Sequence, residues 1–74
     1  MKATDAVREI MKEKNISLGQ MANTLDTSVR LVSDRLRMPN ISLSKLRDLL
    51  RVIDYKIVII PRTTRIPDGG YEIE

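Results

Sequence analysis

The reactive side chains of this chain are guanidinium, ammonium, carboxylate and hydroxyl groups, because its 74 residues include no histidine and no cysteine. The commonest general base and the commonest metal ligand are therefore missing. No glycine-rich phosphate loop and no clustered acid pair organises the remaining carboxylates, serines and lysines. The sequence thus argues against an enzyme and indicates neither a metal nor a cofactor. The chemistry that its arginines and lysines favour is the binding of a polyanion.

The basic side chains are concentrated in the middle of the chain. Residues 28–65 contain nine Lys and Arg against three Asp and Glu, a net +6, whereas residues 1–27 are neutral and residues 66–74 carry −3. A basic segment on so small a domain favours a nucleic-acid partner, and the alternative is a solvated charged surface. Proteins that bind RNA or single strands stack bases on several aromatics. Only two aromatic residues are present, so double-stranded DNA is the favoured partner.

Four helices are expected in residues 1–54, which form the first of two segments. Apolar residues recur at spacings of three and four in each of them, and the strongest apolar stripe lies in the fourth, between residues 42 and 53. Only about three residues separate the second helix from the third, which we place at residues 28–37. The residues that can cap the helices are Thr4 or Asp5, the Ser17–Gln20 capping box, Ser28 and Ser42.

The second segment, residues 55–74, has the composition of β-structure. Residues 55–60 are β-branched and aromatic, which is typical of a strand, and Pro61 ends the run. Residues 67–70 are turn-forming, and residues 71–74 alternate as a short strand does. The sequence therefore predicts a mainly α fold of four helices with a C-terminal β-strand or hairpin.

The run Met21-Ala22-Asn23-Thr24-Leu25-Asp26-Thr27-Ser28-Val29-Arg30-Leu31-Val32-Ser33-Asp34-Arg35-Leu36 resembles the helix-turn-helix of the phage-repressor (Cro-like, XRE) family. The positions that fit the family pattern are Ala22, Leu25, Ser28, Val32, Ser33 and Leu36. Leu18, Asp26 and Arg35 depart from it, because the family often has a glutamine, a glycine and an apolar residue at those positions. The resemblance covers residues 5–54 in outline. It implies a four-helix, lambda-repressor-like DNA-binding domain in residues 1–54.

The resemblance also implies which residues of the third helix contact DNA bases. Carried over by position, they are Val29, Arg30 and Asp34. The Arg30 guanidinium can bond both acceptors of a guanine edge, Val29 can pack on a thymine methyl, and Asp34 can accept from a cytosine amino group. Two alternatives remain open: Arg30 can contact a phosphate instead, and Asp34 can orient Arg30 at i,i+4 spacing.

A second group of polar side chains is expected to contact phosphates, together with the amides at the start of the third helix. Capping alone also explains two of them, Ser17 and Gln20. The candidates for phosphate contact are Ser17, Gln20, Thr27, Ser28, Ser33, Arg37 and Lys45.

A homodimer is expected because the predicted strand is apolar on both faces. One short domain can cover one face only, and an open edge invites pairing. The interface residues are Tyr55, Ile57, Val58, Ile59 and Ile60. Pairing of two copies would place two recognition helices about 34 Å apart, to match an inverted repeat. The alternative is a strand buried within the monomer.

Two classes of function follow from these expectations. The first is a transcriptional repressor, autoregulatory in a phage or mobile element as the resemblance implies. The second is a protein-interaction inhibitor or adaptor that reuses the fold, such as a phage antagonist of a host defence complex. No segment suits a membrane span or a signal peptide, so a cytoplasmic protein is expected. No small-molecule ligand is evident.

Overall fold

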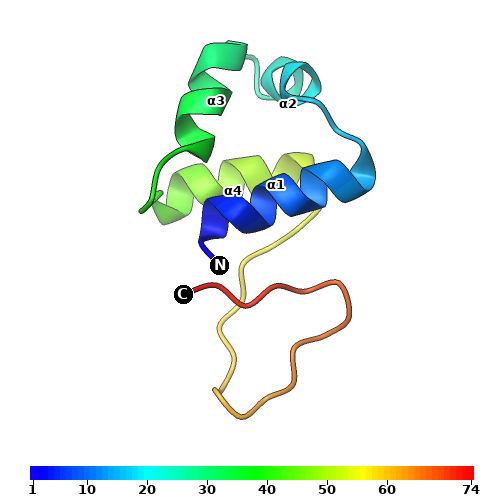
Figure 1. Cartoon of the computed structure of the whole chain (residues 1–74), viewed down its shortest axis with the longest axis vertical. Helices are drawn as coiled ribbons and strands as arrows, with labels where there is room; N and C mark the ends of the chain where they lie inside the picture. Colours follow the sequence, from blue (N-terminus) through cyan, green and yellow to red (C-terminus); the bar gives the residue numbers. More distant parts are fainter.

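The computed structural model describes residues 1–74 and contains four helices and no strand. Helices α1 and α4 lie beside each other, with α2 and α3 on one side of the pair and the C-terminal segment on the other (Figure 1). The mainly α, four-helix prediction is therefore confirmed. The bounds of the helices are α1, Ala3–Lys14; α2, Leu18–Thr24; α3, Val29–Leu36; and α4, Leu43–Val52.

Three of the predicted caps hold their helices as expected. Ser17 Oγ accepts from the Gln20 amide at 3.1 Å while Gln20 Oε1 accepts from the Ser17 amide at 2.7 Å, so the capping box of α2 is complete. Ser28 Oγ accepts from the Leu31 amide, and Ser42 Oγ accepts from the Lys45 amide. Each bond satisfies an amide that has no partner within its helix.

The start of α1 differs from the expectation. Lys2 is the N-cap residue, and the Asp5 carboxylate accepts from the Lys2 amide at 3.1 Å. Thr4 is no cap, because it lies inside the helix and is buried, with its hydroxyl donating to the Met38 carbonyl. The Thr4 hydroxyl therefore bonds to another segment of the chain and does not cap α1.

One hydrophobic cluster of eleven buried residues joins all four helices. Ala22 and Val32 are buried where α2 and α3 meet, and Leu25 packs against the same cluster from the turn. The turn itself contains Asp26 at φ 55°, a left-handed conformation that aspartate tolerates better than most residues. The Thr27 amide then donates to the Ala22 carbonyl at 2.9 Å, which closes the turn before α3 begins.

The single chain does not form the predicted C-terminal strand or hairpin. Residues 55–74 form no ladder, and the backbone of residues 56–60 makes no backbone hydrogen bond. A strand needs a partner, and an isolated hairpin is marginal in water even with a tight turn. Here ten residues with two prolines separate the two apolar runs, and they form separate turns at Pro61–Thr64 and Pro67–Gly70.

Side-chain contacts hold the C-terminal segment against the helices instead. The Tyr55 hydroxyl donates to the Gly69 carbonyl at 2.9 Å, and the Tyr71 hydroxyl donates to Glu13 Oε1 of α1 at 2.6 Å. The two tyrosine rings lie 6.5 Å apart and tilted by 51°. Tyr55 and Tyr71, which the sequence places in strands, therefore attach the C-terminal segment to the rest of the chain.

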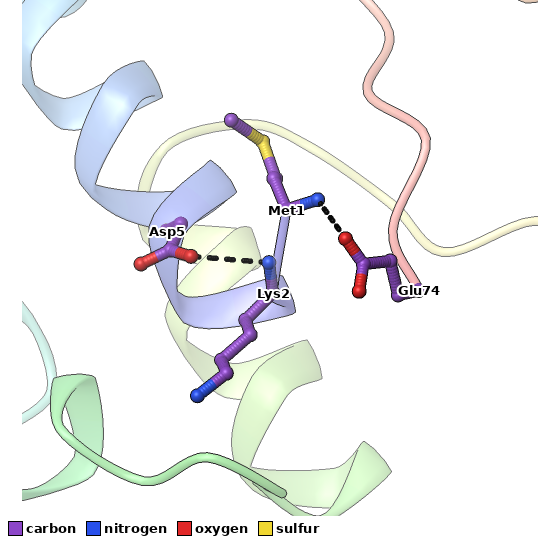
Figure 2. Close-up of polar contacts among 4 residues, drawn as sticks. All are labelled: Met1, Lys2, Asp5 and Glu74. Carbon is purple, nitrogen blue, oxygen red and sulfur yellow. Dashed lines mark hydrogen bonds and ion pairs between the residues drawn. The ribbon is translucent and has the colours of Figure 1, made fainter.

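The ends of the chain also meet (Figure 2). The Met1 ammonium lies 2.8 Å from Glu74 Oε1, and the Glu74 amide donates to the Met1 carbonyl. The hydrogen bond between the charged groups raises the pKa of the Met1 ammonium and lowers the pKa of Glu74. Because the pKa of the Met1 ammonium is raised, its contribution to the stability of the fold is lost as pH rises above about 8. Because the pKa of Glu74 is lowered, its contribution to stability is lost as pH falls below about 4.3. The contact is therefore strongest between those values.

The hydrogen bond to Glu13 raises the pKa of Tyr71 to about 12. We expect its phenolate absorbance to appear near that pH in a Tyr55→Phe background, where Tyr71 is the one tyrosine left. Glu13→Gln should return the midpoint toward about 10, because the neutral amide no longer repels the phenolate. The contact stabilises the fold fully below about pH 10 and is lost as pH rises through 12. A midpoint unchanged by Glu13→Gln would contradict this account.

Candidate nucleic-acid interface

Helix α3 exposes the charged side chains of Arg30 and Asp34 to solvent, together with the apolar Val29 and Leu31. Its other face is held in the core by Val32 and Leu36, four residues apart. The three predicted base-contacting residues, Val29, Arg30 and Asp34, are all exposed. The cap at Ser28 fixes where the helix begins and so which residues turn outward. Arg30 and Asp34, four residues apart, therefore share an accessible helix face, and Val29 is exposed at the start of the helix.

Arg30 and Asp34 do not form an ion pair. The one ion pair in the chain joins the Met1 ammonium to Glu74, so no lysine or arginine side chain is neutralised by a carboxylate. The alternative role of Asp34, orienting Arg30, has no contact to support it. The Arg30 guanidinium has no hydrogen-bond partner within the protein either, and it is available to a ligand.

The predicted phosphate-contacting residues fall into two groups. Ser17, Gln20 and Ser28 are exposed, but their side-chain oxygens already accept hydrogen bonds from helix amides. The others are Thr27, Ser33 and Lys45, which are half-buried, and the exposed Arg37. The first group can reach a phosphate through a hydroxyl proton or a side-chain amide only. Capping is therefore the contact that the structure shows for them.

Arg37 is held beside α3 by a bond that its sequence position did not suggest. Its Nη2 donates to Ser33 Oγ, one turn earlier, at 3.1 Å. Arg8 of α1 reaches the same end of the helix, where its Nη2 donates to the Leu36 carbonyl at 3.0 Å. Two guanidinium groups therefore stand at the C-terminal end of α3, where cations also suit the helix dipole.

The start of α3 carries free donors. The amides of Val29 and Arg30 have no acceptor in the chain, whereas the Leu31 amide is satisfied by Ser28. A helix N-terminus with free amides attracts an anion such as a phosphate oxygen. The exposed face of α3 thus has donors at its beginning, a free guanidinium beside them and guanidinium groups at its end.

Sequence reasoning missed an apolar feature beside this face. A hollow of about 340 Å³ lies between α1, the start of α2 and the end of α3. Its lining comprises Arg8, Met11, Lys12, Ile16, Leu18, Ser33 and Leu36. Leu18 remains 37% exposed there. No spacing in the sequence pointed to this surface, because its lining comes from three separate parts of the chain.

Arg35 of α3 is half-buried. Its Nε atom is buried and has no hydrogen-bond partner. An apolar residue at this position would avoid that unpaired donor, because a buried donor without an acceptor is destabilising. The arginine therefore destabilises the fold at this position.

In comparisons with protein-family models, with curated proteins and with solved structures, nothing matches the chain. No group of three or more acidic, histidine or cysteine side chains is placed to hold a metal ion. None of the four helices has both the length and the apolar character that a membrane crossing requires.

Proposed function

We propose that this protein binds double-stranded DNA in a sequence-specific manner through a helix-turn-helix formed by α2 and α3, and that it acts as a transcriptional repressor. The observation that carries the proposal is the exposed face of α3, where Arg30 has no partner in the chain and the first two amides are free. A helix of eight residues is about 12 Å long, which suits the B-DNA major groove.

Some side chains of α3 contact DNA bases, and others contact the phosphate backbone of the DNA. Arg30 bonds the O6 and N7 acceptors of a guanine, Val29 packs on a thymine methyl, and Asp34 accepts from a cytosine. Ser28 and the amides beside it meet one phosphate strand. Arg37, placed by Ser33 one turn away, meets a phosphate near the other end of the helix.

The proposed active form is a homodimer on an inverted repeat, within the cytoplasm. The four apolar residues 57–60 are exposed in the single chain and lie across α1 and α4 from α2 and α3 (Figure 1). Contacts between two copies there leave both α3 helices uncovered. Because dimers bind two half-sites at once, repression then rises steeply with protein concentration.

The test is a selection of bound duplexes from a random pool, repeated at two salt concentrations. We expect a short inverted repeat, and Arg30→Ala should weaken binding to it by about 1–3 kcal/mol, roughly 5- to 150-fold, while relaxing the preference at one base pair. Arg65→Ala is the matched control, since it removes the same charge from the exposed C-terminal segment. Weak binding without a motif, erased by salt, would contradict sequence-specific recognition.

A second candidate function rests on the apolar hollow beside α3. Leu18 lines the hollow and is exposed there, and Leu31 of α3 is also exposed. Exposed apolar surface of this kind suits a protein partner more than DNA. This supports the protein-interaction inhibitor or adaptor as the alternative. Leu18→Ala separates the two, because it should leave selection of duplex DNA unchanged. If Leu18→Ala abolishes biological activity and Arg30→Ala does not, the alternative holds.

A further inference from the structure

The backbone of residues 56–60 has no hydrogen-bond partner within the single chain. These five residues make no backbone hydrogen bond, and four of them are exposed β-branched side chains, with Ile59 at 99% exposure. β-Branched segments whose backbone donors and acceptors are open tend to pair with another strand. We propose that residues 56–60 of two copies form an antiparallel ladder centred on Val58. The proposal rests on the homodimer of the proposed function and specifies how its two copies pair.

The usable length of this segment is bounded on both sides. Asp54 has a left-handed φ of 62°, and the Tyr55 amide already donates to the Leu50 carbonyl at 2.8 Å. On the other side the chain turns at Pro61, whose carbonyl accepts from the Thr64 amide. A ladder can therefore extend from residue 55 to residue 61 and no further. Its midpoint is Val58.

Two-fold symmetry restricts the pairing further. In a parallel ladder the two strands bond through different residues, so a symmetric pair must be antiparallel. Opposite residues in that ladder point to the same face, and successive residues alternate. The two-fold axis therefore passes between the two copies of one residue, which lie opposite each other. Centring on Val58 places Ile57 opposite Ile59 of the second copy and Tyr55 opposite Pro61.

The available donors agree with that centre. Hydrogen-bonded pairs alternate with pairs that exchange no bonds. When the two Val58 residues form a hydrogen-bonded pair, the next hydrogen-bonded pairs join Lys56 of one copy to Ile60 of the other. The amides of all three residues are free in the single chain. Tyr55 and Pro61 then form a pair that needs no bonds. This is what the chain offers, because the Tyr55 amide is occupied and proline has no amide hydrogen.

Other centres conflict with the same observations. With Ile59 as a hydrogen-bonded centre, Ile57 would need a bond from the amide that Pro61 lacks. With Ile59 as the other kind of pair, the bounds at residues 55 and 61 leave a shorter ladder of residues 57–61. Lys56 then comes to the end where Arg62 of the other copy lies, so that like charges meet. Centring on Ile57 would need the occupied Tyr55 or Asp54 amides. The Val58 centre instead brings Arg62 of one copy to the end where Asp54 of the other lies.

Single-cysteine scanning tests this pairing, because the chain has no cysteine of its own. Opposite Cα atoms of a hydrogen-bonded pair lie about 5.5 Å apart, within reach of a disulfide. Under mild oxidation we expect Val58→Cys to form a covalent dimer and Ile59→Cys alone to form little. A mixture of Ile57→Cys and Ile59→Cys should cross-link, because those residues lie opposite each other. All are measured without DNA, so failure of DNA binding does not affect the result.

Three results would overturn the pairing. Faster cross-linking of Ile59→Cys than of Val58→Cys would move the centre to Ile59. A protein that sediments as a dimer but cross-links at none of these positions would have its interface elsewhere. A protein that sediments as a monomer and binds anionic lipid vesicles would use Ile57–Ile60 and the flanking cations on a membrane surface. In the last case selection of duplex DNA by the wild type still decides the proposed function separately.

Discussion

Replacement of Leu49 by alanine is expected to lower the free energy of unfolding by about 3–5 kcal/mol. Leu49 of α4 is 0% exposed and belongs to the one hydrophobic cluster of the fold. The truncation removes its packing against neighbours on the other helices and leaves a cavity. A domain of 74 residues has a total stability of about 4–11 kcal/mol, so the variant should be largely unfolded near the lower end of that range.

Urea unfolding followed by helical circular dichroism measures this effect. Leu43→Ala is the matched control, because Leu43 lies in the same helix and is 70% exposed. The same chemical change at that position should shift the free energy of unfolding by less than about 0.5 kcal/mol. Equal losses for the two variants would mean that α4 does not contribute its Leu49 face to the core.

The helices could be predicted because their signals are local. Ser17, Ser28 and Ser42 each accept from an amide three residues later, as the cap pattern requires, and no distant residue takes part. Thr4 shows the limit of such signals. Its hydroxyl contacts Met38, 34 residues away, and a sequence window around α1 contains no trace of that partner.

The absence of a strand within the single chain could not be predicted, for the same reason. Residues 57–60 have strong β propensity, but propensity describes how a side chain fits a pleated surface and supplies no partner. Within one chain the partner is absent, since residues 71–74 are attached to α1 and to Met1 through Tyr71 and Glu74. A second copy is what we propose to supply it.

The candidate interface was predictable in position and less so in its contacts. Burial of Val32 and Leu36 follows from the helical period, and exposure of Arg30 and Asp34 follows from it in turn. The bond from Arg37 to Ser33 and the absence of an ion pair at Arg30 depend on rotamers that spacing does not determine. The apolar hollow needs three elements to converge and has no sequence pattern.

Replacement of Ile59 by aspartate should abolish dimerisation while leaving the single chain folded. Ile59 is 99% exposed, so the change removes no contact within the chain. In the proposed ladder each Ile59 packs against Ile57 of the other copy, and burial of an isoleucine contributes about 1.5–3 kcal/mol. Two such contacts are lost, and two carboxylates enter an apolar face. The dimer should therefore weaken by more than about 100-fold, since 1.4 kcal/mol is a factor of ten.

The consequence for DNA distinguishes this variant from one that damages α3. A monomer of Ile59→Asp keeps every residue of the candidate interface, so its binding to one half-site should persist while binding to the full inverted repeat falls. Sedimentation velocity gives the oligomeric state, and titration of half-site and full-site duplexes gives the two affinities. Thr63→Asp, which adds the same charge at another exposed position of the C-terminal segment, is the control. An Ile59→Asp protein that sediments as a dimer would refute the assignment, because no symmetric contact at residues 56–60 tolerates that charge.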